Sequence, residues 1–203
     1  MLPIYPSPEI KSKKILDMCA APGGKAFQTI SFNNDVTLND ISLKRIEKLR
    51  TNMDRLNFSN KIINNNALNM PEINKFDVII LDSPCSGVGT LRRNPDILFK
   101  KTPPNLEFLK KIQLNLINKA AKLLNKNGIL IYMVCSFFYD ETKGIKIKFL
   151  NENNNFSQHS FNSGSNVIFK NFIDVDGDIF SIPTKFKTHM VDGFYSVKFI
   201  KND

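Results

Sequence analysis

Two cysteines occupy positions where thiol chemistry is possible. Each follows an apolar run that predicts a buried strand: Cys85 comes after residues 76–81, and Cys135 after residues 129–134. Each cysteine is itself followed by Ser and a turn. In an open parallel sheet, ligands bind outside the carboxyl ends of the strands, so both thiols would lie at one edge. Such a pair could perform covalent catalysis. The alternative is that each Cys is a small buried apolar residue.

A glycine-rich turn forms a second candidate site. The segment 19–25, CAAPGGK, lies between a short predicted strand at 15–18 and a helix that reaches about residue 32. Its glycines allow close backbone approach to a ligand, and a helix N-terminus favours a carboxylate. The segment matches neither the GxxxxGK[ST] pattern of an ATP loop nor GxGxxG. Asp40 ends the next predicted strand, where an acid can bind ribose hydroxyls or cap a helix.

Strands and helices alternate along the chain, which predicts an α/β fold with a mostly parallel sheet. The tail 194–200 alternates in polarity after a turn at 192–193, and this pattern predicts an antiparallel strand at the sheet margin. The length of 203 residues suits one domain. Within this single domain, 1–203, we expect an N-terminal extension at 1–14 and a polar loop at 151–166.

The charge balance favours a polyanionic partner. The chain has 28 Lys and Arg against 19 Asp and Glu, a formal charge of +9, although a solvated Lys-rich surface is a common alternative. Arg92 and Arg93 are two of five arginines and follow the Cys85 turn, where they could grip phosphate. Three cysteines without CxxC spacing, and two histidines, argue against disulfides or a structural zinc, and we expect no metal.

No apolar run is long enough for a membrane span, and residues 1–14 lack a leader pattern. We therefore expect a cytoplasmic protein without a membrane partner, and leave a nuclear, nucleolar or organellar location open.

Three motifs together resemble a known enzyme family. CAAPGGK at 19–25, DSPCSGVGTLRRNPD at 82–96 and the strand ending in Cys135-Ser136 occur in the order and spacing of S-adenosylmethionine-dependent RNA cytosine-5 methyltransferases of the Nol/Nop/Sun (Fmu-type) family. The resemblance covers roughly 15–150 plus 192–194. It implies a Rossmann-like methyltransferase fold: a mostly parallel twisted sheet, helices on both faces and an antiparallel C-terminal edge strand.

The resemblance also implies a cofactor site for S-adenosyl-L-methionine. Asp40 would bind the ribose, Asn66 would lie on the adenine side, and Asp82 would lie between cofactor and base. Family members carry Asp at the position of Asn66, but an amide oxygen can still accept from the adenine amino group. They also carry Thr at Val134 and usually Asn at Thr142. The residues that would hold the methionine end are Cys19, Ala20, Ala21, Pro22, Gly23, Gly24 and Lys25.

The implied reaction is covalent methylation of carbon 5 of a cytosine in rRNA or tRNA. Cys135 would add to carbon 6, Asp82 would stabilise charge on the ring, and Cys85 would assist release. Thiolate attack needs a lowered thiol pKa, which we expect nearby cations to provide. The cytosine must be unpaired or flipped out, and Arg92 and Arg93 would bind the RNA.

Two alternatives remain open. In DNA cytosine-5 methyltransferases the Pro-Cys position, here Cys85, is the nucleophile. A catalytically silent RNA-binding or scaffold protein would also keep this fold, and the departures at Asn66, Val134 and Thr142 fit that reading. We expect an active monomer that works with a separate RNA-binding domain or subunit.

Overall fold

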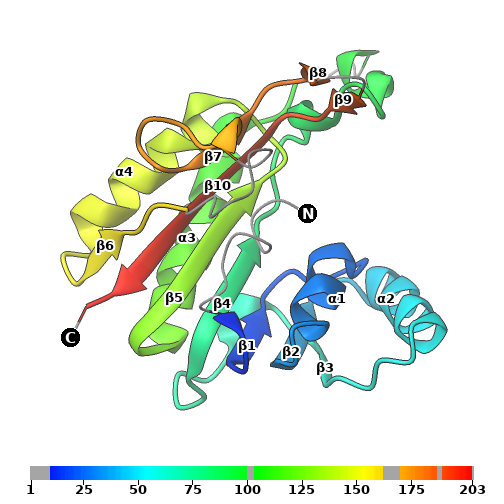
Figure 1. Cartoon of the computed structure of the whole chain (residues 1–203), viewed down its shortest axis with the longest axis vertical. Helices are drawn as coiled ribbons and strands as arrows, with labels where there is room; N and C mark the ends of the chain where they lie inside the picture. The colour runs from blue at the N-terminus through cyan, green and yellow to red at the C-terminus, as the bar shows by residue number, and fades with distance from the viewer. Residues whose placement is uncertain (1–9, 100–102, 162–169, 187–188, 203) are drawn as a thin grey trace.

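The computed structural model describes residues 10–99, 103–161, 170–186 and 189–202 (Figure 1). Within these residues, eight strands form one sheet in the order β3-β2-β1-β4-β5-β10-β6, with β7 also pairing with β10. The strands are β1 (Lys14–Asp17), β2 (Asp35–Asp40), β3 (Ile62–Asn64), β4 (Phe76–Asp82), β5 (Leu124–Val134), β6 (Phe156–Gln158), β7 (Ile179–Ser181) and β10 (Phe194–Lys201). A separate hairpin pairs β8 (Thr184–Phe186) with β9 (His189–Val191).

The first five strands, β1 to β5, form a continuous parallel sheet, and this confirms the predicted α/β fold. The pairs β3–β2, β2–β1, β1–β4 and β4–β5 are all parallel, so the carboxyl ends of five strands meet at one edge. Strand β4 and residues 129–134 of β5 are almost wholly buried, as strands covered on both faces should be. β10 runs antiparallel to β5, as the alternating tail predicted.

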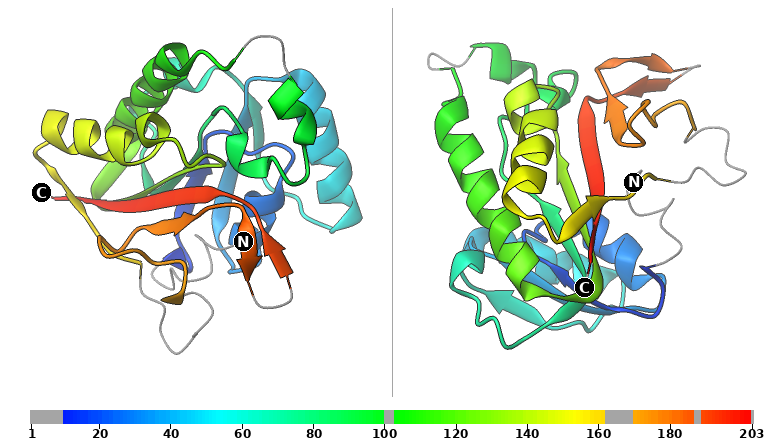
Figure 2. Two further views of the ribbon diagram at one scale, coloured as in Figure 1. Left: turned by 90° about the horizontal axis from the view of Figure 1, so that it is seen from above. Right: turned by 90° about the vertical axis from the view of Figure 1, so that its left-hand side faces the viewer.

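Helices cover both faces of the sheet (Figure 2). On one face, α3 (Leu106–Leu123) and α4 (Lys143–Glu152) bury Ile117 and Phe149 against β4, β5 and β10. On the other face, α1 (Gly24–Ile30) and α2 (Leu43–Arg55) bury Ala26 and Leu49 against β1 and β2. Short 3-10 turns connect the elements: η2 (Ala67–Asn69), η3 (Val88–Thr90), η4 (Pro95–Phe99) and η5 (Tyr139–Glu141).

Three expectations at the margins need correction. β10 is not an edge strand, because β6 and β7 pair with its far side. The expected polar loop at 151–166 contains β6, whose Phe156 is buried in the core, and residues 162–166 lie outside the described part of the chain. The expected extension at 1–14 includes buried Ile10 and Lys14, which begins β1; residues 1–9 are likewise outside the description. Strands of three residues are too short to leave a periodic signal.

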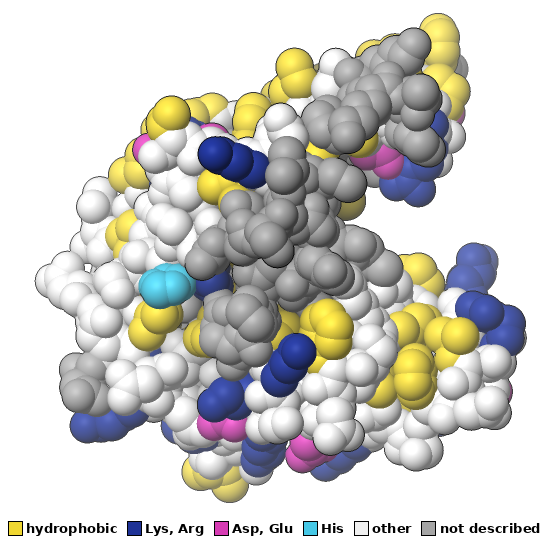
Figure 3. Space-filling model, in the orientation of Figure 1, with side chains coloured by type: hydrophobic (Ala, Val, Ile, Leu, Met, Phe, Trp, Pro, Cys, Tyr) yellow, Lys and Arg dark blue, Asp and Glu magenta, His cyan; other side chains and the backbone are white. Residues whose placement is uncertain are grey.

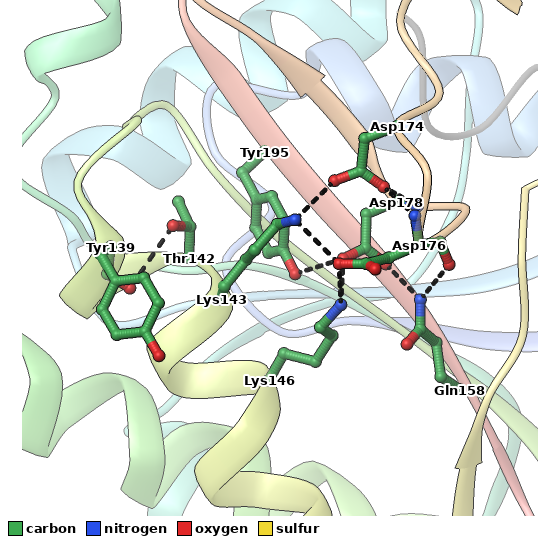
Figure 4. Close-up of polar contacts among 9 residues, drawn as sticks. All are labelled: Tyr139, Thr142, Lys143, Lys146, Gln158, Asp174, Asp176, Asp178 and Tyr195. Carbon is green, nitrogen blue, oxygen red and sulfur yellow. Dashed lines mark hydrogen bonds and ion pairs between the residues drawn. The ribbon is translucent and has the colours of Figure 1, made fainter.

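A cluster of charges fastens α4 to the C-terminal strands (Figure 4). The ammonium of Lys146 lies 2.7 Å from the carboxylate of Asp178 and 3.3 Å from that of Asp176, and Lys143 pairs with Asp176 at 2.8 Å and with Asp174 at 3.0 Å. The carboxylates of Asp174, Asp176 and Asp178 are close enough together to hold a metal ion. The two lysines supply positive charge at this point, so the cluster acts as an internal ionic clamp.

None of the helices in the described residues is long and apolar enough to cross a bilayer.

Candidate active site

Four acidic or thiol side chains gather at the carboxyl edge of the sheet. Asp17, Asp40 and Asp82 end β1, β2 and β4, and Cys135 follows β5 directly. The surface is hollowed between the projection that carries β8 and β9 and the lobe that carries α1 and α2 (Figure 3). The parallel order of the strands therefore brings together residues that are far apart in the sequence.

The CAAPGGK turn is built around a glycine in a backbone conformation that other residues rarely adopt. Gly23 has a φ of 114°, and a Cβ there would come within 2.1 Å of the Phe27 ring. The turn is held against β2, because the amide of Ala20 donates to the carbonyl of Asn39 at 2.8 Å and the amide of Ala21 donates to Asp40 Oδ2 at 3.3 Å. These bonds fix the predicted methionine-binding segment beside the carboxyl end of β2.

Asp40 is enclosed by donors from its own chain. Its side chain is fully buried. Oδ1 accepts from the Ser42 amide at 2.9 Å and from Arg45 Nη2 at 2.8 Å. The carboxylate thus ties the turn to the start of α2, and its predicted contact with ribose stays a prediction. The N-cap of α2 is Ser42, whose hydroxyl accepts from the Arg45 amide, so Asp40 supports the start of the helix without being its cap.

A largely apolar pocket opens beside this turn. It has a volume of about 280 Å³ and reaches from Cys19 past Ile41 to Asn66 and Leu68. The Oδ1 atom of Asn66 accepts from the Leu68 amide at 3.1 Å, so this oxygen, which we expected to face adenine, also caps the turn η2. Apolar walls with a few polar groups are typical of sites for flat heteroaromatic rings.

Lys25 and Asp82 form an ion pair at the centre of the site. Both side chains are mostly buried. Burial works against the charge of Lys25, but Asp82 outweighs it and raises the pKa of Lys25 above its ordinary value. Lys25 also lies 5.7 Å from the Phe194 ring centre. Among the nearby cations, Lys25 lowers the pKa of the Cys135 thiol most.

The two thiols are partly buried, and both hold their protons. Burial raises the pKa of Cys85 to about 12, although the backbone amides of Gly87 and Cys135 oppose the rise. Burial also raises the pKa of Cys135, and the opposing effect of Lys25 is too small to prevent it. The expectation of a lowered thiol pKa is therefore wrong for this structure. Burial of the thiol is the largest cause, and the charge of Asp82, which pairs with Lys25, adds to it.

The C-terminal segment completes the site. The Gly193 amide donates to the carbonyl of Gly89 at 2.7 Å, and a Cβ on Gly89 would lie 2.0 Å from the Gly193 carbonyl oxygen. Arg92 and Arg93 both pair with Asp192, at 3.2 and 2.5 Å. A second pocket of about 480 Å³ lies here, and its lining includes Lys25, Arg92, Arg93, Cys135, Met190 and Phe194. The predicted RNA-binding arginines and the predicted nucleophile thus line one cavity.

Two site residues were missed by the sequence reasoning. Asp17 is buried; burial and the nearby charge of Asp82 raise its pKa to about 7, against the effects of Lys25 and the Cys19 amide. The available signal was an acid at the end of an apolar strand. Glu141 is also buried and bonds to the residues that follow both cysteines, and its sequence position resembled an ordinary acid at a helix start.

Val134 and Thr142, the other two departures from the family pattern, occupy buried positions next to Cys135 and at the start of α4. Val134 is fully buried as the last residue of β5. The Thr142 hydroxyl donates to the carbonyl of Phe138 at 2.8 Å.

Comparison with known proteins identifies the family. The family model described as 16S rRNA methyltransferase RsmB/F matches residues 6–200. The chain belongs to this family. Among the relatives of the RsmB/F-family chain, a ribosomal RNA small subunit methyltransferase B of Shewanella oneidensis is 31% identical over 64% of this chain and 31% of its own length. A tRNA (cytosine(34)-C(5))-methyltransferase of Drosophila melanogaster is 33% identical over 61% of this chain and 20% of its own length.

A solved structure also resembles the RsmB/F-family chain along its whole length. NSun6 from Pyrococcus horikoshii, determined with SFG, aligns with a TM-score of 0.80 and 27% identity over 100% of this chain and 52% of its own. The chain spans about a third or less of the length of these curated relatives. The Rossmann-like methyltransferase fold that the motifs predicted is confirmed.

Proposed function

We propose that this RsmB/F-family chain is a single catalytic domain that transfers a methyl group from S-adenosyl-L-methionine to carbon 5 of a cytosine in rRNA or tRNA. The observation that carries the proposal is the meeting of Cys85, Cys135 and the Lys25–Asp82 pair at the carboxyl edge of the sheet, beside the CAAPGGK turn. The relatives' names support both RNA classes.

The residues at the turn suit the proposed cofactor. The apolar pocket between Cys19 and Leu68 fits an adenine ring, and Asp40 ends the neighbouring strand where ribose hydroxyls would lie. Lys25 and buried Asp17 flank the turn and match the charged groups of an amino acid. When bound, the cofactor supplies an electrophilic methyl group on a positively charged sulfur.

Cys135 is our proposed nucleophile. Its thiolate adds to carbon 6 of the cytosine, and the new S–C bond makes carbon 5 electron-rich enough to take the methyl group. The donor sulfur keeps the electron pair of the broken bond and becomes neutral. The proton on carbon 5 then passes to water, the electron pair of its C–H bond restores the ring double bond, and the C6–S bond breaks to expel Cys135 as a thiolate, with Cys85 assisting this release.

In these steps Lys25 would stabilise the negative charge of the thiolate, and Asp82 would stabilise the charge on the base. The raised thiol pKa means that Cys135 must lose a proton when substrate binds. If Asp82 turns to the exocyclic amine or ring nitrogen 3 of the base, it no longer pairs with Lys25, and Lys25 stabilises the Cys135 thiolate more strongly. Arg92 and Arg93 would hold RNA phosphate at the mouth of the same cavity.

The experiment that tests this proposal compares single-cysteine variants. Labelled cytosine RNA is incubated with cofactor and each variant, then analysed on a denaturing gel and for carbon-5 methylation. Cys135→Ala should lose methylation and any adduct while keeping cofactor affinity, because the thiol does not hold the sulfonium. Cys85→Ala should accumulate a covalent protein–RNA adduct.

The other outcomes decide between the alternatives. An adduct from Cys135→Ala that is absent from Cys85→Ala would assign the nucleophile to Cys85, as in the DNA-type enzymes. A matching DNA strand serves as the substrate control. Cofactor binding without any adduct or methylation by the wild-type chain would favour a silent RNA-binding protein.

A further inference from the structure

Glu141 lies beneath the two cysteine turns and connects them. Its side chain is wholly buried, and its Oε2 atom accepts from the hydroxyls of Ser86 and Ser136, each at 2.6 Å. Oε1 accepts from the Ser86 amide at 2.8 Å and from Gln113 Nε2 at 3.1 Å. Ser86 follows Cys85 and Ser136 follows Cys135, so one carboxylate holds both turns.

The same residue is anchored to the rest of the fold. The hydroxyl of buried Tyr132 on β5 donates to the Glu141 carbonyl at 2.8 Å. Gln113 of α3 donates both to Glu141 and to the carbonyl of Pro84, at 2.9 Å. The position of Glu141 is therefore set by β5 and α3. Through its hydrogen bonds, Glu141 in turn fixes the residue that follows each cysteine.

The chemistry of these bonds explains why a carboxylate stands here. Four donors converge on two oxygen atoms, and a carboxylate has about four acceptor sites. All four donors are neutral groups, and hydrogen bonds to an ionised acceptor are shorter and stronger than neutral ones. The Glu141 carboxylate is therefore fully occupied, although the Oε1 atom of Gln113 has no partner among the described residues. Hydrogen bonds that converge in this way on one buried group hold its partners in a fixed arrangement.

We propose that Glu141 is a positioning residue that sets the placement of the Cys85 and Cys135 thiols relative to each other. It does so through Ser86 and Ser136, without touching substrate or cofactor. The two thiols act at successive stages on one cytosine in the proposed mechanism, so their relative placement matters to the rate. The effect on methyl transfer rests on the proposed function; the effect on thiol geometry does not.

Glu141→Gln is the central test. The variant keeps the size of the side chain but replaces one acceptor oxygen by an NH₂ group. This group is a donor and cannot accept the hydrogen bonds that the carboxylate accepts from the surrounding donors. We expect kcat to fall about 10- to 100-fold, the usual cost of misplacing catalytic groups by about 1 Å. The KM values for RNA and cofactor should change less than about twofold, because the cofactor turn lies on other elements. Glu107→Gln, an exposed change on α3, is the matched control.

A second measurement needs no activity. Trivalent arsenicals bind two thiols that lie side by side, so the affinity of phenylarsine oxide reports the geometry of Cys85 and Cys135. It should be weaker in Glu141→Gln than in wild type and in Glu107→Gln. If the wild-type chain proves to have no methyltransferase activity, this comparison still decides the role of Glu141.

Ser136→Ala keeps the proposal testable if Glu141→Gln does not fold. It removes one of the two short hydroxyl bonds and should show the same pattern with a smaller loss of kcat, about 2- to 12-fold, the range for the net contribution of one typical hydrogen bond. An unchanged kcat and arsenical affinity in both variants would overturn the proposal. So would a fall in kcat that is matched by weaker cofactor binding and a lower melting temperature, since that pattern indicates general loss of structure.

Discussion

Asp17 is a buried carboxyl group whose ionisation should make the stability of the chain depend on pH. Its pKa rises from 3.8 to about 7 in the folded state, with burial as the largest cause and the charge of Asp82 as the next. Between these values the folded chain binds a proton that the unfolded chain has lost. Stability must therefore fall as the pH rises from about 4 to about 7.

The size of the effect follows from the shift. Each pKa unit corresponds to about 1.4 kcal/mol, so the charged Asp17 costs roughly 4 kcal/mol of folding free energy above pH 7. Asp17→Asn cannot ionise and can keep the acceptor for the Cys19 amide. The variant should match wild type near pH 4 and exceed it by up to about 4 kcal/mol at pH 8, a rise of roughly 8 to 16 °C in melting temperature.

Urea denaturation at pH 4, 6 and 8, without cofactor, measures this difference directly. Asp77→Asn is a control of opposite sign, because the Asn125 side chain and the Lys14 amide lower the pKa of Asp77. Its carboxylate contributes stability above pH 4 that is lost as the pH falls, so this variant should be less stable than wild type at pH 8. Parallel pH curves for wild type and Asp17→Asn would refute the reasoning.

Two further perturbations test the ionic contacts. Lys146→Met should lower the free energy of unfolding by roughly 3–5 kcal/mol in urea melts, because it leaves the buried carboxylate of Asp178 without its cation; exposed Lys148→Met is the control, and equal losses would contradict the clamp. Replacing Arg92 and Arg93 together by Ala should flatten the salt dependence of RNA binding by up to about two units of slope, measured by fluorescence titration. An unchanged slope would make these arginines structural.

The sequence predicted those parts of the site that follow from strand order. Cys85 and Cys135 each stand after a long buried strand, and parallel pairing of β4 with β5 places them at one edge. The CAAPGGK turn, our proposed cofactor site, and Asp40 follow from β1 and β2 in the same way. Local pattern was enough here because β4 and β5 contain continuous apolar runs, and β1 and β2 are short apolar-containing strands that end in Asp.

What the sequence left out depends on tertiary contacts. Glu141 and Asp17 gain their roles from burial beside partners more than 50 residues away, such as Ser86 and Asp82, and no local pattern reports such a partner. The thiol pKa was mispredicted for the same reason: burial in the folded chain raises the pKa of Cys135, and Asp82 pairs with the Lys25 cation that the motif alone offered to this thiol.

The antiparallel strand β10 has a consequence for biosynthesis. Ribosomes deliver β5 first, and its neighbour on that side follows only after α4, β6 and β7 have been made. Until then one edge of β5 has unpaired amide and carbonyl groups, and Gly89 lacks its contact with Gly193. A nascent chain that ends before residue 193 would therefore have every cysteine and yet an incomplete candidate site. The candidate site is completed late in translation, when β10 inserts between β5 and β6.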